Sequence, residues 1–183
     1  MQRTALAKAL SPSSVAVIGA TDRKEKLGYS LLLNIINGGY KGRLYAVNPH
    51  YKEVLKVDCY PTILDLPEAV DLAVIIVPST AVLKVVEECS QKDVAGAVII
   101  SAGFKEVGSQ GALLEKDVVK AAKGMRIIGP NCLGIIDTNE EVSLNATFAK
   151  AMPRRGNIGF VSQSGALGAA ILDYAQGKSI GFS

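Results

Sequence analysis

The sequence predicts an α/β fold in which helices cover both faces of a parallel β-sheet. Short apolar runs such as SVAVIG (14–19) and LAVIIV (72–77) recur along the chain, with helical patterns between them. Because these runs are apolar at consecutive positions, they are typical of strands buried on both faces. Strands that alternate with helices in this way form parallel sheets.

The first two predicted strands lie on either side of a helix. SVAVIG leads into the loop GATDRKEKLG (19–28), and YSLLLNIIN is apolar all round, which suits a helix packed on a sheet. Gly38 and Gly39 stop this helix. RLYAV is then closed by Asn48 and Pro49. We therefore expect a strand at 14–19, a helix at 29–37 and a strand at 43–47.

Two further helices and three strands follow in the same alternation. DLAVIIV is halted by Pro78, AVLKVVEECSQK has helical spacing, and GALLEKDVVKAAKG is amphipathic with a glycine stop. Ligands of parallel sheets bind at the carboxyl ends of the strands, near the switch point, and the glycine and proline corners lie at such ends. We expect strands at 71–77, 96–101 and 125–129 and helices at 81–92 and 111–124.

A second unit begins near residue 153. PRRG (153–156) indicates a turn, NIGFVS (157–162) a strand, GALGAAILDYAQ (165–176) a helix and GFS (181–183) the first step of another strand. A single βα unit cannot cover its own apolar faces, so we expect a fragment of a longer chain or a partner that supplies the rest. The predicted organisation is a domain at 1–135, a connecting segment at 136–152 and a truncated α/β domain at 153–183.

Composition argues against several classes of protein. With 49% hydrophobic and 20% charged residues, the chain is typical of a soluble globular protein. Its apolar runs are too short to span a bilayer, and its N-terminus lacks a signal core. A dispersed net charge of +3 and 5% aromatic residues argue against nucleic-acid binding. Cys59, Cys89 and Cys132 fit no disulfide or zinc spacing, so we expect a cytoplasmic setting and no metal site.

The loop after the first strand suits an anionic ligand. A glycine corner between a strand and a helix offers backbone N–H donors and the positive end of the helix dipole. The dinucleotide pattern G-x-G-x-x-G fits poorly, because the next glycine after Gly19 is Gly28. The second strand ends in AVNPHYK, which has no acid for a ribose hydroxyl but has His50 and Lys52. A phosphate-bearing nucleotide is favoured over NAD, and a tight loop without a ligand is the alternative.

Seven segments occur in an order that resembles one enzyme family. They are PSSVAVIGAT…KLG, YAVNP, DLAVIIVP, VIISAGF, IGPNCLG, LNATF and GFVSQSGALG, and they cover nearly the whole chain. Together they resemble the CoA-binding subunit or half of the NDP-forming acyl-CoA synthetases. Acetate–CoA ligases that form ADP are the nearest members, and succinyl-CoA synthetase α subunits are more distant. The resemblance implies a Rossmann-like CoA-binding domain followed by the beginning of a flavodoxin-like ligase domain.

The resemblance also implies which residues bind CoA. The loop after the first strand would wrap the diphosphate, the end of the second strand would bound the adenosine side, and the next strand ends would line the pantetheine path. Lys52 would offer charge to the ribose 3′-phosphate, although His50 stands where relatives often carry lysine. The expected CoA-binding residues are Gly19, Ala20, Thr21, Asp22, Asn48, Pro49, Lys52, Val77, Pro78, Ser79, Ser101, Ala102, Gly103, Asn131 and Cys132.

Cys132 would lie where the CoA thiol meets the acyl group. A nucleophilic cysteine needs a histidine or another group that lowers its pKa. The only histidine, His50, lies at the end of another strand. We therefore interpret Cys132 as a wall or positioning residue rather than a nucleophile.

The segment SQSG opens a helix after a strand and can offer hydroxyls and N–H groups to a phosphoryl group. In the resembled family this helix start receives the phosphate of a phosphohistidine and the acyl phosphate formed from it. A plainer alternative is that Ser162 or Ser164 only caps the helix. The expected phosphate-binding residues are Ser162, Gln163, Ser164 and Gly165.

The resemblance implies the CoA-binding portion of an acid–CoA ligase, which converts a small carboxylate, CoA and ATP to acyl-CoA, ADP and phosphate. The phosphohistidine is expected beyond Ser183, and ATP, ADP and Mg would bind an ATP-grasp domain or β subunit. We thus expect no catalytic residue here, and an oligomer that binds neither nucleic acid nor membrane. The alternatives are the CoA-binding half of an acetyltransferase fusion, a non-catalytic CoA-binding regulator and an NAD-dependent oxidoreductase.

Overall fold

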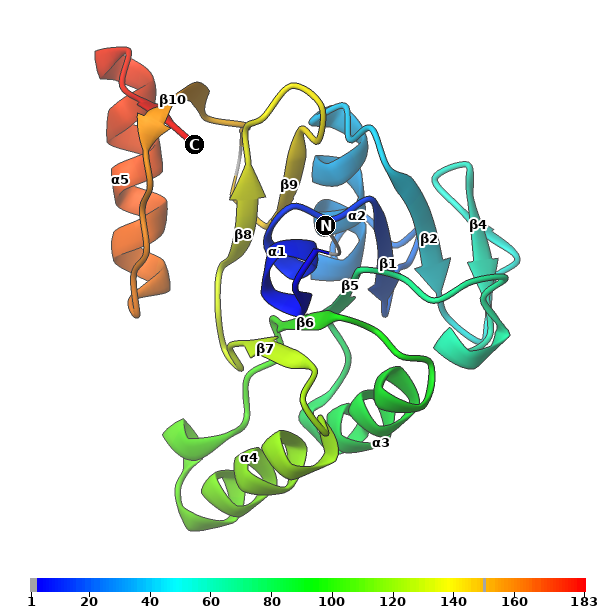
Figure 1. Ribbon diagram of the computed structural model, residues 1–183. Helices are drawn as coiled ribbons and strands as arrows, with labels where there is room; N and C mark the ends of the chain where they lie inside the picture. The colour runs from blue at the N-terminus through cyan, green and yellow to red at the C-terminus, as the bar shows by residue number, and fades with distance from the viewer. Residues whose placement is uncertain (1–2, 150) are drawn as a thin grey trace.

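The centre of the fold is a 7-stranded sheet with the strand order β3-β4-β2-β1-β5-β6-β7. The structure is a computed structural model that describes residues 3–149 and 151–183 (Figure 1). The strands pair in parallel except β3, which is antiparallel to β4 at one edge. The predicted parallel α/β sheet is therefore confirmed. The strands are β1 (Ser14–Ile18), β2 (Arg43–Val47), β3 (Glu53–Val54), β4 (Val57–Tyr60), β5 (Leu72–Ile75), β6 (Gly96–Ile99) and β7 (Arg126–Ile128).

Helices cover both faces of this sheet (Figure 1). On β1, Ala16 and Ile18 pack in one core with α3 and α4, whereas Val15 and Val17 pack in the other with α1 and α2. Neighbouring residues of a strand point to opposite faces, so a run that is apolar at every position supplies both cores. The helices are α1 (Ala5–Leu10), α2 (Leu27–Asn37), α3 (Ser79–Gln91) and α4 (Ser109–Ala121), with short 3₁₀ turns at Ile63–Asp65 and Lys105–Val107.

The chain reverses its direction across the sheet at β1. From β1 it proceeds through β2 to β4, and it then returns to β5 on the other side of β1. The switch point therefore lies between β1 and β5, where the loops leaving the strands diverge and open a crevice.

The segment 136–152 includes most of an antiparallel hairpin that is docked on the first unit. Its strands are β8 (Gly134–Asp137) and β9 (Leu144–Thr147), and every residue of β9 is buried. The hydroxyl of Ser143 donates to the carbonyl oxygen of Gly38 at 2.6 Å, at the end of α2. This hairpin was not predicted from the sequence.

The second unit consists of β10 (Arg154–Ile158), α5 (Gly165–Lys178) and β11 (Gly181–Phe182). The predicted helix and the final strand step are confirmed. The predicted turn at 153–156 is wrong, because Arg154, Arg155 and Gly156 already belong to β10, which ends earlier than the predicted strand. A side chain at Gly156 would collide with the backbone of Gly181, so this glycine permits close strand pairing rather than a turn.

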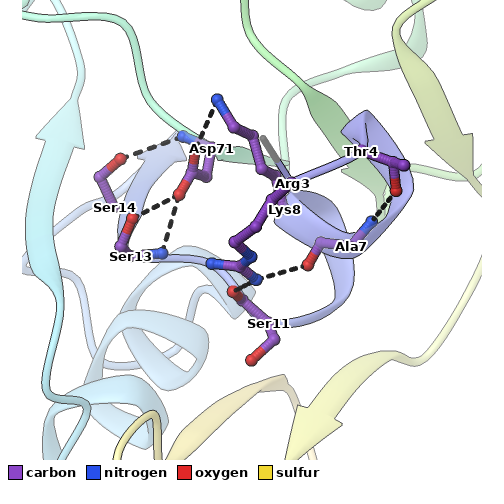
Figure 2. Close-up of polar contacts among 8 residues, drawn as sticks. All are labelled: Arg3, Thr4, Ala7, Lys8, Ser11, Ser13, Ser14 and Asp71. Carbon is purple, nitrogen blue, oxygen red and sulfur yellow. Dashed lines mark hydrogen bonds and ion pairs between the residues drawn. The ribbon is translucent and has the colours of Figure 1, made fainter. Parts of the chain in front are cut away.

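Asp71 ties the N-terminal segment to the sheet (Figure 2). Its carboxylate accepts hydrogen bonds from the backbone N–H and the hydroxyl of Ser13, at 2.9 and 2.5 Å. The ammonium group of Lys8 lies 3.8 Å from the same carboxylate. The backbone N–H of Asp71 in turn donates to the hydroxyl of Ser14 at 3.0 Å. These contacts fix α1 beside the amino ends of the strands.

The packing of α1 on β6 requires glycine at position 96. A Cβ there would overlap the Cβ of Ala9 and lie 3.2 Å from the carbonyl oxygen of Arg126. We expect Gly96→Ala to lower the free energy of unfolding by about 1–3 kcal/mol, measured by urea denaturation. Gly177→Ala is the matched control, because nothing lies within 4 Å of a Cβ at that position in α5. This control should be neutral or stabilising, and equal stabilities for the two variants would contradict the packing.

Candidate functional site

A cleft of about 1190 Å³ runs along the carboxyl ends of the sheet. Its lining includes the residues that directly follow β2, β1, β5 and β6, and Asn131 and Cys132 from the loop after β7. These five strands are consecutive neighbours in the sheet. Neighbouring strands lie about 4.8 Å apart, so these five ends span roughly 19 Å. The rest of the wall comes from the start of α2, from Phe148 and from the start of α5, among other residues. The shape suits a long, narrow ligand that touches both units.

Two glycines let the backbone close around the switch point. Gly19 has a φ of +98°, and a Cβ there would collide with the carbonyl oxygen of Ile76. A Cβ at Gly28 would collide with the carbonyl oxygen of Gly19 itself. Because neither position has room for a side chain, α2 begins directly against the end of β1. The N-terminal end of α2, with its positive dipole, therefore borders the cleft.

The end of β2 is tied to the first loop by its own side chains. Asn48 donates from Nδ2 to the carbonyl oxygen of Ala20 at 2.8 Å and accepts from the backbone N–H of His50 at 3.0 Å. The hydroxyl groups of Thr21 and Tyr51 lie 3.1 Å apart, within hydrogen-bond distance. Asn48, His50, Tyr51 and Thr21 all line the cleft, whereas the predicted Ala20 is buried beneath it.

Asp22 supports the first loop from outside the cleft. Its carboxylate accepts a hydrogen bond from the backbone N–H of Leu55 at 3.1 Å, in the turn between β3 and β4. Pro49 and Lys52, also expected to contact the ligand, are not among the residues that line the cleft.

The ends of β5 and β6 supply three of the predicted lining residues. Val77, Ser101 and Ala102 lie in the cleft wall, and the Ser101 hydroxyl donates to the carbonyl oxygen of Val77 at 2.5 Å. A Cβ on Gly103 would lie 2.7 Å from the hydroxyl oxygen of Ser79, so these two residues fill the corner behind the wall. Of the residues predicted at these two ends, Pro78, Ser79 and Gly103 do not line the cleft.

At the end of β7, Asn131 and Cys132 both line the cleft. The Cys132 sulfur lies 3.3 Å from the carbonyl oxygen of Ile99 and 3.7 Å from that of Ile128. Burial raises the pKa of the Cys132 thiol, which keeps it protonated at neutral pH. This environment favours a wall residue over a nucleophile.

The second unit brings the start of α5 to the cleft. Gln163 and Gly165 line it, together with Ala166 and Ala169 from the first turns of the helix. The Ser164 hydroxyl accepts a hydrogen bond from the backbone N–H of Leu167 at 3.3 Å and so caps α5. The Ser162 hydroxyl accepts from the backbone N–H of Ser164 at 3.0 Å. The capping alternative thus describes Ser164, while Gln163 and Gly165 are the predicted residues that face the cleft.

Several lining residues were not named from the sequence. The charged run DRKEK could have been recognised as lining the cleft, because it lies in the loop between the first strand and a helix whose start borders the cleft. LNATF was recognised as a segment, but nothing in it indicated where its aromatic side chain lies. Tyr51 carried no signal. The missed residues include Arg23, Glu25, Lys26, Tyr51, Leu133 and Phe148.

Membrane-spanning helices and metal-binding clusters are both absent from the described residues, 3–149 and 151–183. No helix among them combines the length and apolar character needed to cross a membrane. No group of three or more His, Cys, Asp or Glu side chains among them gathers as possible metal ligands. Cys59, Cys89 and Cys132 are all free thiols.

Known proteins resemble this chain over most of its length. A family model described as a CoA binding domain matches residues 13–138. The chain is 50% identical over 174 residues to acetate–CoA ligase (ADP-forming) I of Archaeoglobus fulgidus, covering 94% of this chain and 25% of that protein. It is 46% identical over 176 residues to subunit alpha of acetate–CoA ligase (ADP-forming) II of Pyrococcus furiosus, covering 94% and 37%.

A solved structure is also similar to this chain over nearly its whole length. Dinucleotide forming acetyl-coenzyme A synthetase 1 of Ca. Korarchaeum cryptofilum, in complex with phosphate and ADP, superposes with a TM-score of 0.91 at 42% identity. The match covers 97% of this chain and 38% of that one. The chain therefore spans between 25% and 38% of the length of these relatives.

Cys132 should react slowly with thiol reagents. Thiolate is the reactive form and burial raises the pKa, so at about pH 8 iodoacetamide should alkylate Cys132 about tenfold more slowly in the folded chain than in urea. The rate should rise as the pH increases further, because the thiolate fraction grows. Cys89, whose pKa burial raises to about 12, is the internal control and should react more slowly still. Peptide mass spectrometry measures both rates, and a Cys132 that reacts faster when folded would contradict the assignment.

Proposed function

Since this chain belongs to the CoA binding domain family, we propose that its cleft binds coenzyme A and that it forms the CoA-binding portion of an ADP-forming acid–CoA ligase. The observation that carries the proposal is the convergence of five strand ends and the start of α5 on one cleft. The relatives are acetate–CoA ligases and an acetyl-coenzyme A synthetase, which favours a ligase over an acetyltransferase fusion, a stand-alone regulator or an oxidoreductase.

Coenzyme A would lie along the cleft from β2 to β7. The adenosine would lie by Asn48 and His50, and the diphosphate would bind the loop at Gly19, where backbone donors and the α2 dipole favour an anion. Arg23 and Lys26, which line the cleft, would supply positive charge to the phosphates. The pantetheine arm would then pass Val77, Ser101 and Ala102 and bring the thiol to Asn131 and Cys132.

The start of α5 would hold the phosphoryl group of an acyl phosphate. Gln163 and Gly165 lie at the N-terminal end of a 14-residue helix, whose dipole stabilises negative charge. The CoA sulfur would attack the acyl carbon, a carbon–sulfur bond would form, and the carbon–oxygen bond to phosphate would break. The thiol proton would leave with solvent or phosphate, and phosphate would depart with the electron pair.

Other parts of the enzyme would make the acyl phosphate. The only histidine of this chain, His50, lies at the adenosine end of the cleft, so a phosphohistidine would come from another segment. An ATP-grasp domain or β subunit would bind ATP and Mg, and the naming of one relative as a subunit alpha supports a separate partner. We propose the domains 1–135 and 153–183 as parts of this assembly, and a cytoplasmic location in view of the free thiols.

Titration of the 183-residue chain with CoA tests the proposal. We expect calorimetry to show binding with a Kd of about 1–100 μM, no comparable heat with NAD, and no turnover of acetate, CoA and ATP. Arg23→Ala and Lys26→Ala should each weaken CoA binding by about threefold to tenfold at low salt and by less at high salt. Lys120→Ala, which removes a charge from α4, is the matched control. A folded chain that gives no heat with CoA would refute the proposal.

A further inference from the structure

Phe148 is an aromatic side chain that the fold leaves uncovered at the cleft. It directly follows β9, in which every residue is buried, yet it is 42% exposed and lines the cleft. Large apolar side chains gain free energy when they leave water, so a ligand that covers this ring would be stabilised by it.

The backbone around Phe148 is held on both sides by one side chain. Nδ2 of Asn34, on α2, donates to the carbonyl oxygens of Thr147 and Ala149, each at 2.8 Å. The Thr147 hydroxyl accepts from the backbone N–H of Ala149 at 3.0 Å and donates to Oδ1 of Asn145 at 2.6 Å. Asn145 and Thr147 are only 2% and 1% exposed. A polar network that includes two buried side chains therefore holds the backbone on both sides of the ring.

The strand register places Phe148 at one end of the cleft. In the β8–β9 ladder Thr147 pairs with Gly134, so Phe148 lies beside Leu133, the residue that follows Cys132. Leu133 also borders α5, because a Cβ on Gly165 would lie 3.7 Å from it. Phe148 therefore lies where the end of β7 meets the helix start, away from the residues that follow β2.

We infer that Phe148, held in place by Asn34, forms the apolar wall against which the pantetheine end of CoA packs next to α5. The inference rests on the proposed function. The pantetheine arm is the least polar part of CoA, and the adenosine would lie at the opposite end of the cleft. Phe148 contacts the ligand, and Asn34 is a positioning residue that acts through it.

Phe148→Ala should weaken the binding of the pantetheine end of CoA and leave the binding of the adenosine end unchanged. In calorimetry on the 183-residue chain, its Kd for CoA should rise about tenfold, because an apolar contact is lost. Its Kd for adenosine 3′,5′-bisphosphate, which lacks the pantetheine arm, should stay within about twofold. Phe148→Leu keeps an apolar side chain and should lose less affinity. Phe160→Ala is the matched control, since Phe160 is 40% exposed but does not line the cleft.

Asn34→Ala tests the positioning role through a double-mutant cycle. Alone it should weaken CoA binding about threefold to tenfold, and in the Phe148→Ala chain it should have no further effect. Thermal unfolding of each variant shows whether it is folded. If Phe148→Ala does not fold, Phe148→Leu replaces it in the cycle.

Two results would overturn the inference while leaving CoA binding intact. One is an unchanged Kd for CoA in Phe148→Ala, and the other is an equal loss of affinity for CoA and for the bisphosphate, which would place the ring at the adenosine. If the unsubstituted chain binds neither ligand, the proposed function fails as well, so the two failures are distinguishable.

Discussion

The close approach of three backbone segments at the switch point is the constraint on which the site depends. The carbonyl oxygen of Ile76 occupies the space that a side chain at position 19 would need, and the carbonyl oxygen of Gly19 occupies the space that one at position 28 would need. Because both positions are glycine, the ends of β1 and β5 and the first turn of α2 come together. A methyl group at position 28 would force the first turn of α2 away from the end of β1, and one at position 19 would force the ends of β1 and β5 apart.

The β8–β9 hairpin connects this switch point to the second unit. It begins where β7 ends, and β9 packs along α2, the helix whose first turn borders the loop after β1. The backbone after β9 then leads to the second unit. The loop after β1 and the backbone around Phe148 therefore share one support, which is α2, and a displacement of this helix would move both.

The sequence allowed most of the first unit and much of the site to be predicted, and the reasons are specific. β1, β5 and β6 were found because strands buried on both faces are apolar at every position. Gly19, Asn48, Val77, Ser101 and Asn131, which the family resemblance implied, lie together in the cleft because the carboxyl ends of parallel strands meet at one edge. β4 and β9 were missed because they are short and include polar residues, and in β9 the side chains of Asn145 and Thr147 are buried and hydrogen-bonded to each other. Tertiary structure also decides where Asp22 and Phe148 lie: Asp22 bonds to Leu55, and the backbone around Phe148 is held by Asn34.

The two walls of the cleft differ in how firmly they are held. The strand ends belong to a sheet with a core on each face, whereas α5 is joined to the rest by a few contacts. The Thr138 hydroxyl donates to the carbonyl oxygen of Phe182 in a buried hydrogen bond of 2.6 Å, which contributes about 1 kcal/mol. The ion pair of Arg155 with Glu140, at 2.8 Å, is exposed and adds at most about 1 kcal/mol. The geometry of the cleft beside β7 is therefore set by the sheet and the hairpin, and a ligand that spans the cleft would itself strengthen the attachment of α5.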